Sequence, residues 1–144
     1  MPKLRSVVSS RPPIHLLDRE SDLLGDIALQ LEHRFPVVSA MLLAEIERAE
    51  IHNADTLPAD AVTIGSEVEF VDESSGNSRR VRIVMPAEAD IEAGRISVLT
   101  PIGAGLIGLT TGQAIDWPDL EGREHRIRIL DVRQPARDTG AIAA

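Results

Sequence analysis

The apolar positions near the start of the chain repeat at the spacing of α-helices. A first amphipathic helix is predicted to begin after an N-cap at Asp18 and to end near His33. Its apolar positions are Leu23, Leu24, Ile27, Ala28 and Leu31. Pro36 is suited to begin a second helix, which would run to about Ile51. Its apolar positions are Val38, Leu42, Ile46 and Ala49, and its polar positions include Glu45, Glu47, Arg48 and Glu50.

Only a few residues around Arg34 and Phe35 separate these helices, so they should pack against each other as an antiparallel hairpin. Each helix would hold about 15 residues and therefore span only about 22 Å. Residues 14–17, just before the first helix, could form a short strand or an extended segment.

Beyond residue 61 the apolar period becomes two, which is typical of β-strands. Residues 67–70 and 80–83 alternate between polar and apolar side chains. The Ser-Ser-Gly-Asn sequence at 74–77 is a turn signal, so the two runs predict a β-hairpin. Residues 96–99 predict a third strand.

A short helix is predicted next, with Thr100 as N-cap and Pro101 at the first helical position. It would continue through Leu109. Residues 114–117 and 126–129 predict a final pair of strands.

The order of these elements predicts an α+β fold, in which a short N-terminal antiparallel helical hairpin precedes a β-rich domain with one short helix. A polar segment containing Pro58 marks the boundary between the two parts. The predicted divisions are a flexible N-terminal segment (1–13), the helical hairpin (14–52), a linker (53–61), the β-rich domain (62–135) and a flexible tail (136–144).

Charge and composition narrow the possible partners. The net charge is −8, from 15 basic and 23 acidic residues, and such a chain is repelled by phosphate backbones, so direct nucleic-acid binding is not expected. The aromatic residues are Phe35, Phe70 and Trp117, too few for base stacking. No apolar run reaches the roughly 18 residues of a membrane span or resembles a signal peptide, so the expectation is a cytoplasmic protein without membrane contact.

The sequence offers little sign of catalysis. It has no cysteine, and its histidines lie at 15, 33, 52 and 125 without the spacing of a metal site. Gly103, Gly105 and Gly108 match Gly-x-Gly-x-x-Gly, but a βαβ context is missing. We interpret these glycines as allowing close backbone packing. No enzyme activity, catalytic residue, metal or other cofactor is predicted.

The segment from Ile96 to Gln113, Ile-Ser-Val-Leu-Thr-Pro-Ile-Gly-Ala-Gly-Leu-Ile-Gly-Leu-Thr-Thr-Gly-Gln, resembles the signature of the GreA/GreB transcription elongation factor superfamily. Within it, Glu45–Ala49, Trp117-Pro118 and Gln134-Pro135 are similar to the Rnk branch, the regulators of nucleoside diphosphate kinase. The chain departs from the family pattern in having Gly105 where alanine is usual and Gln113 where aspartate is usual.

The resemblance implies an FKBP-like C-terminal domain that docks on RNA polymerase near its secondary channel, with a monomer favoured. The residues it implies for docking are Thr100, Pro101, Ile102, Gly103, Leu106, Gln113 and Trp117. Alternatively, Ile102 and Leu106 could simply fill the core. Thr100, Pro101 and Trp117 are the preferred contact residues, and truncation of Pro101 or Trp117 is expected to weaken binding without unfolding the domain.

The predicted hairpin tip comprises Glu32, His33, Arg34 and Phe35. By resemblance, it would point toward the channel, where Gre factors use a pair of acidic residues to help bind catalytic magnesium. One carboxylate next to Arg34 is a poor magnesium site, so the chain is expected to compete with Gre factors without stimulating transcript cleavage. Two alternatives stay open: an FKBP-like prolyl isomerase, and a protein-interaction module acting on nucleoside diphosphate kinase levels.

Overall fold

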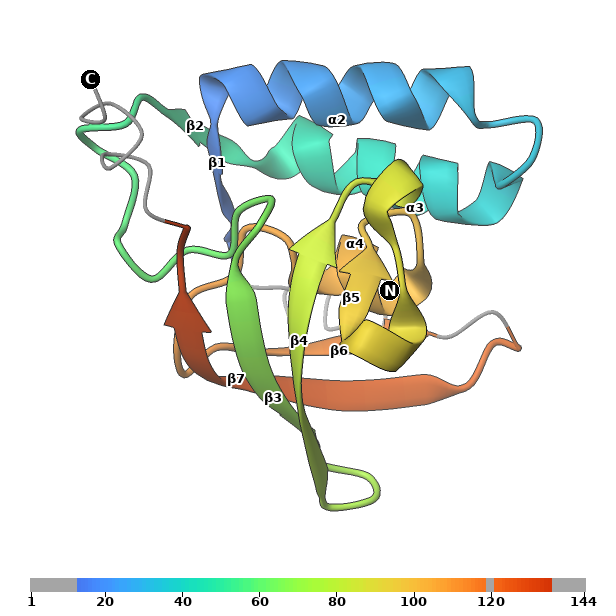
Figure 1. Ribbon diagram of the computed structural model, residues 1–144, viewed down its shortest axis with the longest axis vertical. Helices are drawn as coiled ribbons and strands as arrows, with labels where there is room; N and C mark the ends of the chain where they lie inside the picture. Colours follow the sequence, from blue (N-terminus) through green and yellow to red (C-terminus); the bar gives the residue numbers. More distant parts are fainter. Residues whose placement is uncertain (1–12, 119–120, 136–144) are drawn as a thin grey trace, which may run out of the picture.

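The computed structural model describes residues 13–118 and 121–135 and has an α+β fold. Two helices lie side by side across one end of a five-stranded sheet (Figure 1). In chain order the elements are β1 (His15–Leu17), α2 (Asp18–Gln30), α3 (Pro36–Arg48), β2 (Glu50–His52), β3 (Glu67–Asp72), β4 (Asn77–Val84), the 3₁₀ helices η1 (Pro86–Glu88) and η2 (Ile91–Ala93), β5 (Arg95–Ser97), α4 (Pro101–Leu106), β6 (Ala114–Pro118) and β7 (Glu124–Arg133).

The main sheet has the strand order β5-β4-β3-β7-β6, and all neighbours are antiparallel except β4 and β5. The predicted hairpin is confirmed as β3 and β4, with Val68 opposite Val81 and Phe70 opposite Arg79. Gly76 adopts a φ of +80° in the connecting turn, a conformation that glycine reaches without strain. The predicted third strand lies at β5, which ends earlier than expected, at Ser97.

The final strand pair is also confirmed, but β7 is much longer than the predicted 126–129. It pairs with both β3 and β6 and therefore lies inside the sheet. Its register against β3 shifts between Glu69 and Phe70, which marks a bulge. Because of this bulge, the residues of β7 do not alternate strictly between apolar and polar, and the full length of the strand could not be predicted from alternation.

The two predicted helices are present as α2 and α3, each 13 residues long, so each spans only about 20 Å. The predicted N-cap was wrong by one position. Asp18 is the first helical residue, and Leu17 occupies the N-cap without a side-chain hydrogen bond. The first helix ends at Gln30 rather than near His33.

The second helix ends at Arg48, and the prediction that it reaches Ile51 was wrong. Ala49 is extended, with φ −76° and ψ 152°, and the next three residues form strand β2. This strand pairs in parallel with β1, and Glu50 N–H donates to the carbonyl of Ile14 at 2.9 Å. Thus the chain segments that enter and leave the helical hairpin are hydrogen-bonded to each other (Figure 1).

The helices and the sheet bury their apolar side chains in one core cluster. Leu24 and Ala28 of α2 and Leu42 of α3 are fully buried in the same cluster as residues from every strand of the main sheet. Glu45, expected on a polar face, is instead 1% exposed, and its carboxylate accepts from Arg48 at 2.7 Å. The helical hairpin therefore shares one hydrophobic core with the sheet.

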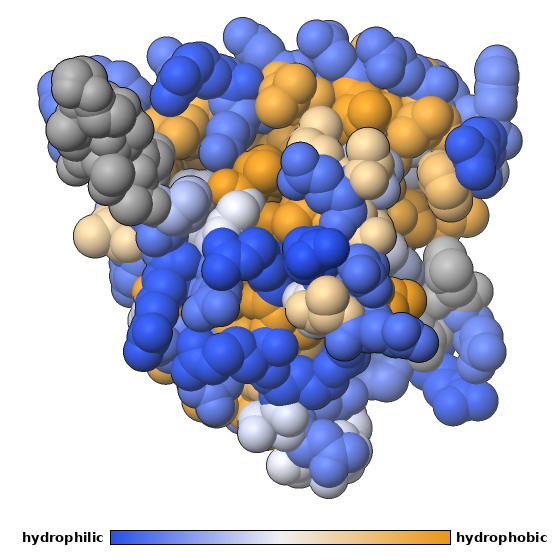
Figure 2. All heavy atoms as spheres, in the orientation of Figure 1, coloured by the Kyte–Doolittle hydropathy of each residue, from blue (hydrophilic) through white to orange (hydrophobic). Residues whose placement is uncertain are grey.

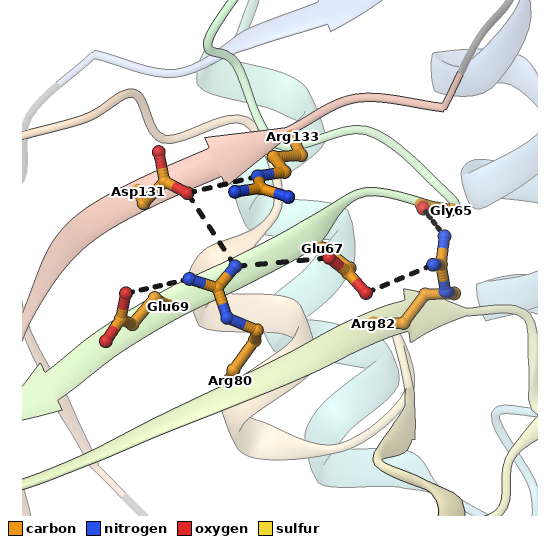
Figure 3. Close-up of polar contacts among 7 residues, drawn as sticks. All are labelled: Gly65, Glu67, Glu69, Arg80, Arg82, Asp131 and Arg133. Carbon is orange, nitrogen blue, oxygen red and sulfur yellow. Dashed lines mark hydrogen bonds and ion pairs between the residues drawn. The ribbon is translucent and has the colours of Figure 1, made fainter.

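The outer face of the sheet carries a network of ion pairs (Figure 3). Arg80 Nη2 lies 2.9 Å from Glu69 Oε1, and Arg80 Nη1 lies 3.7 Å from Asp131 Oδ2. Arg82 Nη2 lies 3.2 Å from Glu67 Oε2. In Figure 2 this part of the surface is largely hydrophilic, whereas apolar side chains show next to the helices. Across the described ranges, no helix is both long and apolar enough to cross a membrane.

Candidate docking surface

The turn from β5 into α4 has the predicted N-cap at Thr100. Its Oγ1 accepts from Gly103 N–H at 3.0 Å and donates to the carbonyl of Ser97 at 2.8 Å. Pro101 follows at the start of the helix, where its missing N–H leaves no bond unmade. Both predictions are confirmed, although the helix ends at Leu106 and not at Leu109.

Two glycines let this short helix pack closely against its neighbours. A Cβ on Gly103 would overlap the carbonyl oxygen of Ser97 and lie 2.8 Å from the Cα of Val98. A Cβ on Gly105 would lie 2.9 Å from the ring of Trp117. The interpretation of the Gly-x-Gly pattern as a close-packing device is therefore confirmed.

The surface is hollowed on both sides of Pro101 and Ile102. We use the term docking surface for the two hollows together with Arg79, Thr100, Pro101 and Ile102. One hollow is a cavity of about 270 Å³, here called the Trp117 cavity. It is lined by Phe70, Asp72, Ser75, Asn77, Arg79, Pro101, Ile102, Trp117, His125 and Ile127. The other is an open groove of about 540 Å³, here called the Ile91 groove. It is lined by Arg79, Ala89, Ile91, Ile96, Ser97, Thr100, Pro101, Ile102 and Glu121.

Both hollows are mostly apolar, and they share one cation. Ile91 is 75% exposed at the rim of the groove, an unusual position for a large apolar side chain. Arg79 is exposed and lines both hollows. It lies opposite Phe70, whose side chain is buried, so its register places it on the inner face of the sheet. Within the described ranges no ion pair is found for Arg79, whereas Arg80 and Arg82 on the outer face are paired.

The structure divides the predicted docking residues into groups. Thr100, Pro101 and Ile102 are half-buried and lie together on the docking surface. Gly103, Leu106 and Trp117 are buried. Trp117 is only 2% exposed, so its truncation would disturb packing as well as any contact made in the cavity.

Gln113 lies in a turn and supports it. Its Oε1 accepts from Thr110 N–H at 2.8 Å, and its backbone N–H donates to the Thr110 carbonyl at 3.1 Å. Gln113 does not line either hollow.

The tip residues Glu32 to Phe35 are exposed at the far end of the helical hairpin, and the Arg34 guanidinium lies 5.3 Å from the centre of the Phe35 ring.

A histidine–carboxylate pair lines the Trp117 cavity. His125 Nδ1 lies 2.9 Å from Asp72 Oδ2, and Ser74 N–H donates to Asp72 Oδ1 at 2.9 Å. Burial opposes ionisation of Asp72, but the hydrogen bonds from His125 and Ser74 outweigh it and hold the pKa of this carboxyl below its ordinary value of 3.8. Sequence reasoning missed this pair because the two residues lie 53 positions apart.

The lowered pKa of Asp72 gives a pH-dependent contribution to stability. The folded form binds a proton less readily than the unfolded form, so the contribution is present above the unfolded pKa and is lost as pH falls through the lower folded value. Asp72→Asn should therefore lower the free energy of unfolding by about 1 kcal/mol at pH ~6 and by much less at pH ~2.5. Urea titrations at the two pH values measure this difference. Asp26→Asn, at an exposed position in α2, is the control, and an equal loss from Asp72→Asn at both pH values would contradict the assignment.

Comparison with a solved structure places the fold among bacterial transcription factors. The chain resembles a prokaryotic transcription elongation factor GreA/GreB from Nitrosomonas europaea, with 34% sequence identity and a TM-score of 0.66. The match covers 85% of this chain and 98% of that one.

The family described as "Transcription elongation factor, GreA/GreB, C-term" matches residues 57–134, and the chain belongs to this family. It is 29% identical to the regulator of nucleoside diphosphate kinase of Escherichia coli K12, over 91% of this chain and 96% of that relative. It is 40% identical to the transcription elongation factor GreA of Acidiphilium cryptum, over 63% of this chain and 60% of the GreA. The predicted resemblance to this superfamily, and within it to the regulators of nucleoside diphosphate kinase, is confirmed. These relatives are named as regulators or elongation factors, not as enzymes.

Proposed function

We propose that the protein is a non-catalytic regulator that binds RNA polymerase through the docking surface, near the secondary channel, in the cytoplasm. The observation that carries this proposal is the pair of apolar hollows around Pro101 and Ile102, with Arg79 between them, in the part of the chain that defines the family. An apolar centre with one cation suits a protein segment that offers an apolar side chain and a carboxylate.

The hairpin supports binding without stimulation of cleavage. Glu32 is the one carboxylate in the loop from 31 to 35, and hard divalent cations usually need several oxygen ligands. With helices of about 20 Å that pack along the core, the tip has little reach beyond the body of the protein. A factor with such a tip that occupies the site used by Gre factors would prevent them from binding. It would not itself stimulate transcript cleavage.

The charge distribution supports a protein partner rather than direct contact with nucleic acid. On the sheet, the guanidinium groups of Arg80, Arg82, Arg126 and Arg128 each lie near a carboxylate. With these cations neutralised and a net charge of −8, the sheet offers no basic stripe for a phosphate backbone. The expected polymerase contact is therefore protein to protein.

Substitution of Ile102 tests the docking surface. Ile102→Glu should weaken binding to core RNA polymerase at least tenfold, because it places a carboxylate in an apolar contact, a loss of about 1.4 kcal/mol or more. Retention on immobilised polymerase and a titrated dissociation constant measure the loss. Val37→Glu makes a similar change in charge at a 58% exposed position on α3 and should bind normally.

Because Ile102 is half-buried, Arg79→Glu provides a second variant at an exposed position. It should also weaken binding, since it reverses the charge shared by the two hollows. In a transcript-cleavage assay, the wild-type protein should inhibit Gre-stimulated cleavage and cause none by itself. Cleavage stimulated by the protein alone, or normal binding by both variants, would overturn the proposal.

The Trp117 cavity favours prolyl isomerase activity as a second candidate. Phe70 and Trp117, two of the three aromatic residues, line one apolar cavity, and aromatic walls of this kind suit a proline ring. Fold likeness alone does not establish such an activity. A proline-peptide isomerisation assay separates the candidates, because the docking function needs no turnover.

If neither turnover nor polymerase binding is seen, the third candidate remains. It is an interaction module that acts on nucleoside diphosphate kinase levels, as the name of the E. coli relative suggests.

A further inference from the structure

Two histidines that are far apart in the sequence meet where the helical hairpin joins the rest of the protein. His15 lies in β1, and His52 lies in β2 together with Glu50. Parallel pairing of these strands places the three side chains in one cluster. The spacing of histidines along the chain predicted no metal site and gave no sign of this meeting, because it depends on a strand pair that the helical pattern concealed.

The three facing atoms form a nearly equilateral triangle. His15 Nδ1 lies 3.0 Å from His52 Nε2 and 3.1 Å from Glu50 Oε1, and His52 Nε2 lies 3.3 Å from the same Oε1. In a tetrahedral zinc site with bonds of about 2.0–2.1 Å, two ligand atoms are separated by about 3.3 Å. The triangle thus has close to the dimensions of one face of such a site.

The hydrogen bonds around His52 determine which of its nitrogens faces the cluster with a lone pair. The Thr56 hydroxyl donates to the carbonyl of Asn53 at 3.5 Å, so its oxygen is available to accept from His52 Nδ1–H at 3.0 Å. With the proton on Nδ1, Nε2 faces His15 and Glu50 as an acceptor. Metal-ligating histidines usually donate their other ring N–H to an oxygen acceptor, and Thr56 Oγ1 stands in the position of such an acceptor.

Hydrogen bonding alone leaves one edge of this triangle unfavourable. The Glu50 carboxylate can only accept, and in the neutral tautomer with the proton on Nδ1 His52 Nε2 is also an acceptor, so their 3.3 Å contact then has no proton between them. A proton on His15 Nδ1 can be donated to only one of these neighbours at a time. A cation at the centre would bind all three lone pairs together.

From this geometry we infer that His15, Glu50 and His52 form a binding site for a divalent transition metal, with Zn²⁺ as the best fit. Two imidazoles and one carboxylate suit zinc, and they leave a fourth position for water or another ligand. The Glu50 side chain is 66% exposed, so the fourth position faces solvent. The histidine side chains, at 19% and 16% exposed, form the inner wall.

The location gives the metal a structural role. It would join β1, which leads into α2, to β2, which follows α3, and so fix both ends of the helical hairpin to each other. His15 N–H also donates to the carbonyl of Gly108, just after α4, at 2.9 Å. The metal would therefore strengthen the attachment of the hairpin to the segment that carries the docking surface.

The test uses the full chain after removal of metal by a chelator. Zn²⁺ titrated by calorimetry should bind one ion per chain with micromolar or tighter affinity, and Co²⁺ should give the absorption of a tetrahedral site. At a hundredfold excess of free Zn²⁺ over the dissociation constant, the Tm should rise by about 5–10 °C. Mg²⁺, which prefers oxygen ligands, should give neither binding nor a change in Tm.

His52→Gln and Glu50→Gln should each weaken Zn²⁺ binding at least tenfold. His33→Gln, at an exposed histidine in the hairpin tip, is the matched control and should bind normally. Because Glu50 is exposed, its variant keeps the test valid even if His52→Gln folds poorly. The site is refuted if Zn²⁺ binds only at millimolar concentration, or if Glu50→Gln and His33→Gln bind it equally well.

Discussion

Gly103→Ala is expected to lower the free energy of unfolding by about 3 kcal/mol. The added Cβ would overlap the carbonyl oxygen of Ser97 and crowd the Cα of Val98, both of which are backbone atoms that no rotamer change can move. Relief requires α4 to shift away from β5, which opens the core beneath Leu106 and displaces Pro101 and Ile102. Urea unfolding followed by far-UV circular dichroism measures the loss.

Gly25→Ala provides the matched control in α2. Apart from its two chain neighbours and the backbone of its own helix, no atom lies within 4 Å of the Cβ that it would add, and the position is helical. Alanine should therefore stabilise the protein by about 0.5–1 kcal/mol. If Gly103→Ala instead unfolds like the wild type, α4 can move without cost, and the close packing does not set the shape of the docking surface.

The sequence predicted the elements that depend on local signals. The alternating residues of β3 and β4 and the turn at 74–77 lie next to one another in the chain, so the hairpin and its approximate register follow from the pattern. The Thr100-Pro101 pair likewise contains both the cap and the first position of α4. Such signals act over a few residues and do not depend on the rest of the fold.

Elements that depend on distant partners were missed. Ala49 continues the helical period of α3, and no glycine or proline follows it before residue 58, so little in the local pattern shows that residues 50–52 form a strand with β1. Glu45 was expected on the polar face, but it lies seven residues after Val38 and three after Leu42, so helical spacing places it on the buried side of α3. At β2, tertiary contacts override the local pattern, whereas at Glu45 the charge of the side chain misled the prediction.

The candidate site was predicted in part. Thr100, Pro101 and Ile102 were expected on the docking surface, whereas Arg79 was missed. A signal for Arg79 was available: counting outward from a turn at 74–77 places it opposite Asp72, a position that faces the same side as Phe70, and the structure pairs it with Phe70 itself on the inner face. The burial of Trp117 follows from Gly105, where the missing side chain leaves space for the indole ring. The FKBP-like fold and the coiled-coil character of the hairpin stay predictions.

Leu42→Ala is expected to lower the free energy of unfolding by about 3 kcal/mol, because the side chain is fully buried where α3 meets the common core. The sharper expectation concerns cooperativity. Far-UV circular dichroism is dominated by α2 and α3, whereas fluorescence reports on Trp117, the single tryptophan, in strand β6. If one core serves both parts, the two signals should shift together in a urea titration, with coincident midpoints before and after the substitution.

Leu29→Ala, at a 57% exposed position of α2, is the control and should change stability by no more than about 0.5 kcal/mol. A hairpin that folds independently would give a different result, in which Leu42→Ala lowers the midpoint of the helical signal and leaves that of Trp117 unchanged. The distinction bears on the proposed function. A hairpin that shares its core with the sheet keeps its tip at a fixed position relative to Pro101 and Ile102, so under the proposed function binding through the docking surface would also determine where the tip lies on the polymerase.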